Sequence, residues 1–161
     1  MDNNRTFILH PIGIIHSPFS AKSTTPIQPS RSDSLGQIEV FPEYISGLQD
    51  LDGFSHIILI YLFHEAADYS LLVKPFLDDN KRGLFSTRYP SRPNPIGLSV
   101  VQLLSVSQNL LQISGVDVLD GTPLLDIKPY IPEFDAHNEV RTGWFDLTNK
   151  NRHRIYPDSI D

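Results

Sequence analysis

The residues best suited to chemistry surround the stretch RYPSRPNPIGLSV, residues 88–100. Arg88 and Arg92 lie four residues apart on a backbone whose three prolines prevent both a helix and a central strand. A backbone that is ordered before binding loses little entropy, and two guanidinium groups on it suit a carboxylate or a phosphate. Asn94 stands between two of these prolines, so its side-chain amide could recognise a base edge or a backbone group. The alternative is that both arginines pair with nearby acids and only anchor the loop.

A second polar segment, LDGTPLLDIKPY, contains a strong turn signal in Asp-Gly-Thr. Asp120 and Asp126 flank this turn, and Lys128 follows Asp126 closely. A carboxylate and loop N–H groups at a turn suit a ribose or an amine. The alternative is an Asx turn, in which Asp120 only caps the two residues that follow it.

Several other chemistries are disfavoured. The chain has no cysteine, which removes thiol nucleophiles, thiolate metal ligands and disulfides. The six histidines show no convincing metal-ligand spacing, and there is no Gly-x-Ser-x-Gly, Gly-x-Gly-x-x-Gly or Walker-type motif. His64 and Glu65 directly follow the apolar run 57–63. A histidine in that position is more often structural than catalytic.

Charge and composition limit the possible partners. The formal net charge of −6 argues against a general nucleic-acid coat, although Lys81, Arg82, Arg88 and Arg92 form a local basic cluster. The N-terminus lacks the pattern of a signal peptide, and the longest apolar run is too short to span a bilayer. We therefore expect a soluble protein of the cytoplasm with no membrane association.

The pattern of short apolar segments predicts strands rather than helices. Turn residues separate the segments, no helical pattern lasts for ten residues, and Gln108-Asn109 marks a hairpin. These features predict an all-β fold, a single β-barrel with short helical turns and long functional loops. We expect strands within residues 7–17, 37–41, 55–66, 96–108, 110–119 and 123–131, and one helical turn within 42–54. The polar segments 25–31, 63–66 with 86–95, and 119–130 would then converge at one end of the barrel.

Three long segments carry a family resemblance. FSHIILIYLFH, RGLFSTRYPSRPNPIGLSVVQLL and DVLDGTPLLDIKPYIP closely resemble the TsaA-like family, whose characterised members are tRNA methyltransferases. GIIHSPF and PIQP fit the family too, so the similarity runs in order over about residues 7–132. The resemblance implies a barrel domain over residues 1–148 with a C-terminal tail at 149–161. It also implies a homodimer that holds S-adenosyl-L-methionine near the subunit interface.

The implied reaction transfers a methyl group to N6 of N6-threonylcarbamoyladenosine, next to the anticodon of threonine tRNA. Because the step is an in-line displacement at the methyl carbon, positioning is the main contribution of the protein. The candidates for a general base are His64, Glu65 and Asp126, and the sequence does not choose among them. By position, the resemblance implies that the cofactor binds Pro26, Gln28, Pro29, His64, Glu65, Arg88, Leu98, Leu119, Asp120, Gly121 and Thr122. Arg82, Arg92, Asn94 and Lys128 are the candidates for contacts with the tRNA substrate.

The chain departs from the family pattern in two places. Many bacterial members have an additional C-terminal domain, where this chain has a short segment whose Trp144 and Phe145 would cover the barrel or a partner subunit. The family often has an arginine where this chain has Ile27, and Arg31 is close enough to substitute. Two alternatives stay open: the same barrel methylating another substrate, and a module that senses S-adenosyl-L-methionine without catalysis.

Overall fold

The computed structural model describes residues 5–22, 33–76 and 78–147. The chain divides into two compact units. The barrel unit comprises Met1–Tyr69 and Pro90–Tyr130, and the second unit comprises Ser70–Tyr89 and Ile131–Asp161. None of the helices in the described ranges has the length and apolar character needed to cross a membrane.

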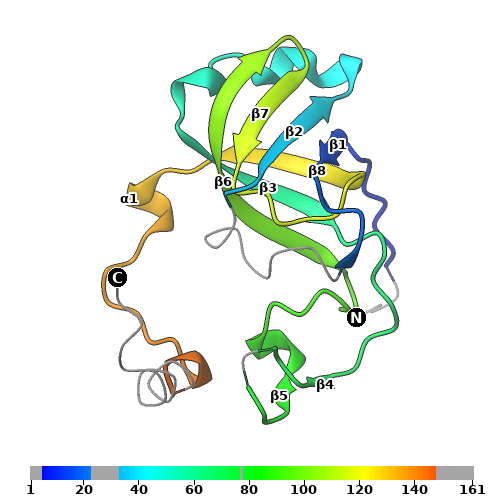
Figure 1. The fold of residues 1–161 in the computed structure, drawn as a ribbon, viewed down its shortest axis with the longest axis vertical. Helices are drawn as coiled ribbons and strands as arrows, with labels where there is room; N and C mark the ends of the chain where they lie inside the picture. Colours follow the sequence, from blue (N-terminus) through cyan, green and yellow to red (C-terminus); the bar gives the residue numbers. More distant parts are fainter. Residues whose placement is uncertain (1–4, 23–32, 77, 148–161) are drawn as a thin grey trace. The chain divides into compact units, whose positions relative to one another are not determined.

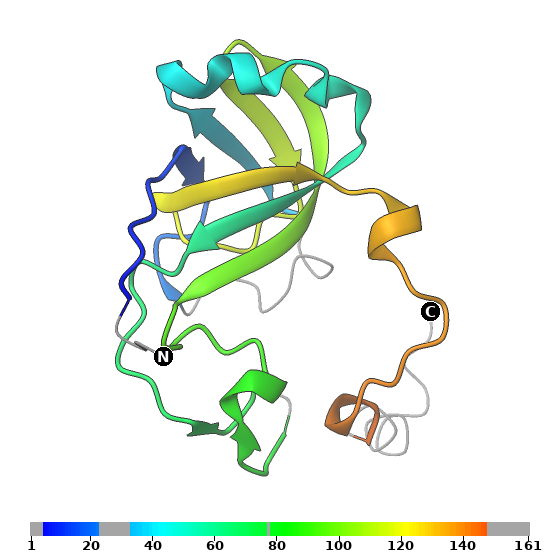
Figure 2. The ribbon, with the colours of Figure 1, turned by 180° about the vertical axis from the view of Figure 1, so that it is seen from behind.

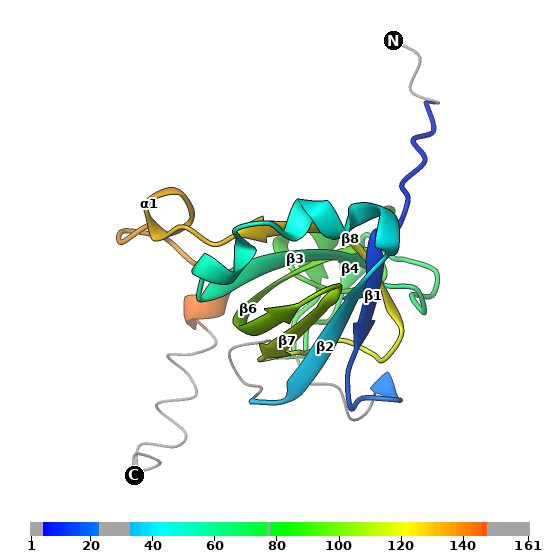
Figure 3. The same cartoon turned by 90° about the horizontal axis from the view of Figure 1, so that it is seen from above.

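Six antiparallel strands of the barrel unit close into a barrel in the order β1-β2-β7-β6-β3-β8 (Figure 1). Figure 3 shows β6, β7, β2 and β1 following one another around its wall. The expectation of an all-β barrel with short helical turns is therefore confirmed. The strands are β1 (Gly13–His16), β2 (Leu35–Val40), β3 (His56–Leu62), β6 (Ile96–Ser107), β7 (Leu110–Ser114) and β8 (Thr122–Pro129).

Alternation of side chains along each strand builds the core of the barrel. In β3, Ile57, Leu59 and Tyr61 are buried, whereas the residues between them are partly exposed on the outer face. Burying one such aliphatic side chain contributes about 1.5–3 kcal/mol. The core consists of Ile15, Ile38, Val40, Ile57, Leu59, Tyr61, Val101, Leu103, Leu111, Ile113, Val116, Val118 and Leu124.

The strand boundaries differ from the sequence-based expectations for local reasons. The first strand begins at Gly13, after Pro11, because proline has no N–H to donate to a neighbouring strand. β7 ends at Ser114, before Gly115 with its φ of 91°. Between β2 and β3, two 3-10 helices replace the single expected turn: η3 (Pro42–Leu48) and η4 (Leu51–Gly53). The predicted hairpin is confirmed, because Ser107 pairs with Leu110 across a two-residue turn.

The second unit is small and has little regular structure. It contains β4 (Leu72–Val73) paired with β5 (Arg82–Gly83), η5 (Leu84–Ser86) and the short helix α1 (Pro132–Asp135). The indole of Trp144 donates a hydrogen bond of 2.9 Å to the carbonyl of Ser86. The guanidinium of Arg82 lies 5.6 Å from the centre of the same ring. Within the second unit, Trp144 thus binds segment 82–86.

The pairing register places three connections at the same end of the barrel, which we call the loop end. β1 stops there at His16, β3 at Leu62 and β7 at Ser114, whereas β2, β6 and β8 begin there. The loop end is therefore shared by segments 17–22, 33–34 and 115–121, and by the residues next to Leu62 and Ile96. Figure 2 shows η3 and η4, in cyan, at the opposite end together with the β6–β7 hairpin.

Candidate functional site at the loop end of the barrel

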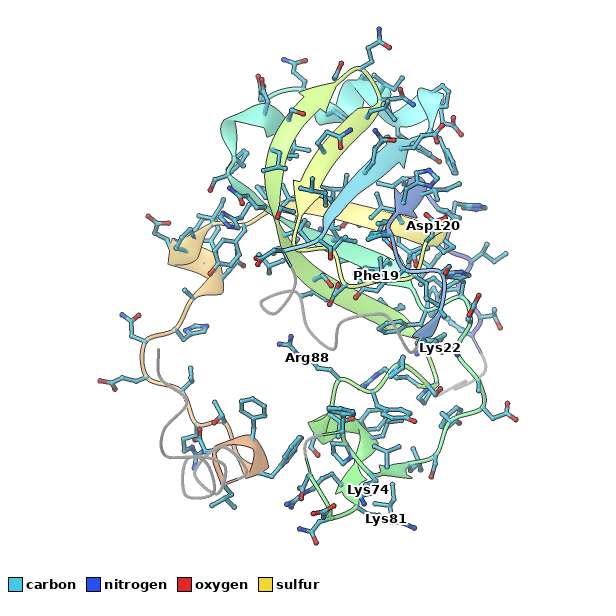
Figure 4. All side chains as sticks on the ribbon, in the orientation of Figure 1. Phe19, Lys22, Lys74, Lys81, Arg88 and Asp120 are labelled. Carbon is cyan, nitrogen blue, oxygen red and sulfur yellow. The ribbon has the colours of Figure 1, made fainter. Side chains whose placement is uncertain are left out.

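Backbone hydrogen bonds join the connections at the loop end. The N–H of Asp120 donates to the carbonyl of Phe19 at 2.8 Å, and the N–H of Gly121 donates to the carbonyl of Ile15 at 3.0 Å. The ammonium of Lys22 donates to the carbonyl of Glu65 (Figure 4 labels Phe19, Lys22 and Asp120). Segment 17–22 is thereby bound both to the 115–121 connection and to the chain after β3. Of the segments predicted to converge, residues 63–66, 90–95 and 119–122 share the loop end, whereas β8 leads residues 123–130 away from it and residues 25–31 lie outside the described residues.

The carboxylate of Asp120 is held by the segment after β1. Its Oδ1 accepts the N–H of Ser17 at 3.0 Å and lies 3.5 Å from Nδ1 of His16. Nε2 of His16 lies 3.4 Å from Oε2 of Glu39, so the imidazole bridges two carboxylates through opposite nitrogens. The contact of Asp120 with Ser17 differs from the Asx turn considered as the alternative. It fixes the orientation of a carboxylate that stays half exposed.

The Asp-Gly-Thr turn next to this carboxylate is rigid. Gly121 has a φ of +78°, a left-handed conformation that disfavours residues with a Cβ. The hydroxyl of Thr122 donates to the carbonyl of Leu119 at 2.7 Å, and its side chain is buried. Because the N–H groups of Asp120 and Gly121 already donate within the fold, a ligand at this turn would meet side chains and carbonyls. The N–H groups of this turn are therefore engaged within the fold, whereas the Asp120 carboxylate is half exposed.

Other predicted site residues share the loop end. His64 and Glu65 follow β3, and both side chains are exposed. The N–H of Phe63 donates to the carbonyl of Pro95 at 2.7 Å, which joins this segment to the proline-rich chain before β6. That chain carries Arg92, partly buried, and Asn94, exposed. Leu98 follows on the outer face of β6 with 53% of its surface exposed.

The two arginines of the proline-rich stretch belong to different units. Arg92 is part of the barrel unit, whereas Arg88 is an exposed residue of the second unit. Arg82, another predicted substrate contact, forms an ion pair with Asp78 in addition to its contact with Trp144. The N–H of Asn80 and the Arg82 guanidinium lower the pKa of the Asp78 carboxyl below its ordinary value. Arg82 thus has a defined structural role within the second unit.

Asp126 and Lys128 are not brought to the Asp120 turn. They form an ion pair of 2.8 Å on β8, and this hydrogen bond raises the pKa of Lys128 above its ordinary value. Asp126 contributes to the lining of an open hollow of about 560 Å³, together with residues of η3 and η4 at the opposite end. β8 therefore carries both side chains away from the loop end.

Three predicted cofactor contacts, Pro26, Gln28 and Pro29, lie outside the described residues, as do Ile27 and Arg31. In the described ranges there is no group of three or more His, Asp or Glu side chains that could hold a metal ion.

Sequence reasoning missed a buried polar chain near the loop end. The hydroxyl of Tyr61 lies 2.9 Å from Oγ of Ser99, and Ser99 donates to Oδ1 of Asp117 at 2.8 Å. A signal for it was present in the sequence, because Ser99 stands at an inward position of β6 whose inward neighbours are Gly97 and Val101. Asp117 likewise stands between two valines that are buried.

Comparison with known proteins identifies the family. Residues 14–136 match the family described as tRNA-methyltransferase O N-terminal domain. A Pyrococcus abyssi protein, named as a probable S-adenosyl-L-methionine-binding protein, is 56% identical over 146 residues, covering 90% of this chain and 78% of the relative. The tRNA (adenine(37)-N6)-methyltransferase of Homo sapiens is 38% identical over 152 residues, covering 89% of this chain and 34% of the relative.

Solved structures agree with this match. The crystal structure of TrmO from Pseudomonas aeruginosa superposes with a TM-score of 0.75 at 41% identity. The similarity covers 88% of this chain and 64% of that chain, so the present chain spans slightly less than two thirds of the solved protein. The chain belongs to the family of the tRNA-methyltransferase O N-terminal domain, as its resemblance to the TsaA-like proteins implied.

Proposed function

We propose that this chain binds S-adenosyl-L-methionine at the loop end and transfers its methyl group to N6 of threonylcarbamoyladenosine in tRNA, near the anticodon. Membership of the family supports the proposal, because relatives are named tRNA (adenine(37)-N6)-methyltransferases and S-adenosyl-L-methionine-binding proteins. The observation that carries it is the rigid turn 119–122, held against segment 17–22 at the same barrel end as His64 and Glu65.

The described residues fit the chemical groups of this cofactor. The oriented carboxylate of Asp120 can accept hydrogen bonds from ribose hydroxyls or from the amino group. The exposed side chain of Leu98 offers an apolar surface suited to the adenine ring. When bound, the cofactor supplies an electrophilic methyl group on a sulfonium. The contribution of the protein is to hold that methyl group in line with the acceptor nitrogen.

The acceptor nitrogen must lose its proton during the transfer. It belongs to a urea-like group whose carbonyl makes this proton more acidic, so a weak base is sufficient. His64 and Glu65 are the candidates we retain, because they lie exposed at the loop end. Asp126 is left out of the proposed site, because it lies with η3 and η4 toward the opposite end. Arg88, Arg92 and Asn94 stay proposed contacts for the cofactor carboxylate or for tRNA.

Incubation with isotopically labelled S-adenosyl-L-methionine and tRNA tests the proposal. The nucleosides should then contain a methylated threonylcarbamoyladenosine by mass spectrometry. A matched tRNA that lacks the threonylcarbamoyl group is the control, and it should take up no label. Transfer to both tRNAs, or to neither, would contradict the proposed acceptor.

A second function is favoured by the names of the archaeal relatives. A protein of Archaeoglobus fulgidus, 44% identical over 133 residues, is named for binding S-adenosyl-L-methionine and not for transferring its methyl group. A binding module would retain the labelled cofactor in equilibrium dialysis but would label no RNA. A barrel that methylates another substrate would label a different fraction of a cell extract.

We also propose a homodimer and, because the substrate is a tRNA, a cytoplasmic location. Large apolar side chains that are mostly exposed in both units support self-association, among them Phe7, Phe76, Phe85 and Phe134. Size-exclusion chromatography with light scattering should give twice the mass of the chain. A monomer at micromolar concentration would contradict the dimer.

A further inference from the structure

The imidazole of His16 lies between two carboxylates at the loop end. Its Nε2 is 3.4 Å from Oε2 of Glu39, and its Nδ1 is 3.5 Å from Oδ1 of Asp120. The three side chains come from β1, from β2 and from the 115–121 connection. The histidine side chain is 41% exposed and the two carboxylate side chains are about half exposed, so water and protons reach all three groups.

The alternation of the strands explains how these side chains meet. His16 follows the fully buried Ile15, so it points to the outer face of β1. Glu39 lies on the same face of β2, in a position diagonal to His16 that a long side chain can span. Ser17 comes directly after His16, and its N–H donates to Oδ1 of Asp120 at 3.0 Å. Two consecutive residues at the end of β1 therefore contact the same carboxylate oxygen.

The contacts of His16 on both sides fit only one protonation state. A neutral imidazole has one N–H and one nitrogen that only accepts, and a carboxylate also only accepts. If His16 were neutral, one of its nitrogens would face a carboxylate oxygen with no proton between them. The imidazolium donates on both sides, so the observed contacts match the protonated form.

Glu39 and Asp120 are the charged groups that face the imidazole in the described ranges. Next to His16 lies an open hollow of about 330 Å³, which is lined by residues 17–18 and by uncharged residues of β2 and β7. β8, on the other side of β1, pairs with it through the neutral residues 122–124. Since histidine changes its charge between about pH 5 and 8, the two contacts of the imidazole depend on the pH of the solution.

The contacts of Asp120 leave one of its oxygens available. Ser17 and His16 both contact Oδ1, and in the described ranges Oδ2 has no partner. The imidazolium connects this carboxylate to β2 through Glu39, which limits its rotation. It also offsets part of the negative charge, so Oδ2 suits a neutral donor such as a ribose hydroxyl better than a second cation.

We propose that His16 is a positioning residue for Asp120, whose carboxylate it fixes, in its protonated form, for a ribose hydroxyl of S-adenosyl-L-methionine. This inference rests on the proposed function. Glu39 takes part by holding the far side of the imidazolium. The contribution of His16 to the affinity is then complete in mild acid and is lost as the pH rises through the titration of the imidazole.

Titration calorimetry with S-adenosyl-L-methionine from about pH 5.5 to 8.5 tests the inference. His16→Gln keeps a polar side chain but cannot become a cation. It should bind about two- to fivefold more weakly than the wild type at the acid end, the range for an exposed ion pair, and equally well at the basic end. The ratio of the two affinities cancels the titration of the ligand and of the other histidines. His56→Gln, at the opposite end of β3, is the matched control and should give a ratio of one throughout.

Glu39→Gln tests the positioning role without changing either His16 or Asp120. The imidazolium loses one of its two anionic partners, so the fall in affinity with rising pH should begin about 0.2 to 0.7 pH units lower. A loss of packing alone would lower thermal stability but leave the pH profile in place. Glu43→Gln, on exposed η3 at the opposite end, is the matched control and should keep the wild-type profile.

The affinity ratio of His16→Gln decides the inference. A ratio that is the same at every pH would overturn it, because the imidazolium would then make no specific contribution. Tighter binding by His16→Gln in acid would also overturn it, since the imidazolium would be competing with the ligand for Asp120. If that variant does not fold, an unshifted profile in Glu39→Gln overturns the inference. Wild-type protein that does not bind S-adenosyl-L-methionine would instead refute the proposed function.

Discussion

The barrel unit and the second unit are stabilised in different ways. The barrel closes its sheet around a continuous aliphatic core and leaves no strand of that sheet unpaired on either side. Among the described residues of the second unit, the buried apolar residues are Val73, Pro75 and Leu84. The second unit depends instead on local polar contacts, such as Arg82 with Asp78 and Trp144 with Ser86. We therefore expect the barrel to be the cooperative folding unit and the second unit to open at lower cost.

This difference is consistent with two tasks of the proposed function. The barrel presents carboxylates held by neighbouring backbone, which suits a small ligand that must be oriented. The second unit presents cationic side chains, including Lys74, Lys81 and Arg88 (Figure 4), on a segment with few buried contacts. Flexible cationic side chains suit the phosphates of a larger partner.

Removing a core side chain should have the largest effect. Ile57→Ala deletes a fully buried side chain of β3 and should lower the free energy of unfolding by about 2–5 kcal/mol. Circular dichroism in urea follows the barrel strands. Trp144 is the sole tryptophan of the sequence, so its fluorescence reports on the second unit separately. In the wild type, the fluorescence change should occur at a lower urea concentration than the loss of the circular dichroism signal. Ile57→Ala should shift only the circular dichroism transition. Coincident transitions in both proteins would show that the two units unfold as one.

The close approach of Gly97 and Tyr61 gives the next largest effect. Gly97→Ala places a Cβ against the Tyr61 ring and should cost about 1–3 kcal/mol in stability. Gly47→Ala is the control, because nothing lies near the added Cβ there. Combining Gly97→Ala with Tyr61→Leu should recover part of the loss, since the bulky ring is gone. Additive effects in urea unfolding would mean that the two side chains do not clash.

Arg88→Ala tests the second unit's part in function. The side chain is exposed, so barrel stability by circular dichroism should stay within about 0.5 kcal/mol of the wild type. Cofactor affinity or methyl transfer should fall about tenfold or more, as expected for the loss of a charge-assisted hydrogen bond. Arg5→Ala, an exposed arginine of the barrel unit, is the control. Wild-type binding and transfer by Arg88→Ala would remove this arginine from the proposed site.

The structure also shows which strands, turns and contacts could be predicted from the sequence. The apolar run 57–63 predicted β3, and the turn residues Gln108-Asn109 predicted the hairpin that contains β6, because these signals are local. Asp120 and Asp126 flank one turn in the sequence, but a strand advances about 3.3 Å per residue, so β8 separates them. The contact of Ser99 with Asp117 depends on strand register and barrel closure, which no local pattern specifies.

The smallest expected effect concerns the acid stability of the second unit. The N–H of Asn80 and the Arg82 guanidinium lower the pKa of Asp78 below its ordinary value of 3.8. A carboxyl group whose pKa is lower in the folded state binds its proton more readily when unfolded. Its stabilisation is therefore complete above pH 3.8 and is lost as the pH falls through the lower, folded-state pKa.

Trp144 fluorescence reports this loss, because Arg82 also lies over the indole ring. Asp78→Asn should shift the fluorescence midpoint in urea at pH 6 slightly to lower urea and make it less sensitive to acid below pH 3.8. Asp79→Asn removes an exposed neighbouring carboxylate, which pairs with Lys74 at 3.3 Å, and is the matched control. The circular dichroism transition of the barrel should be the same in all three proteins. An equal shift in the barrel transition would mean that Asp78 supports both units, and the separation between them would have to be abandoned.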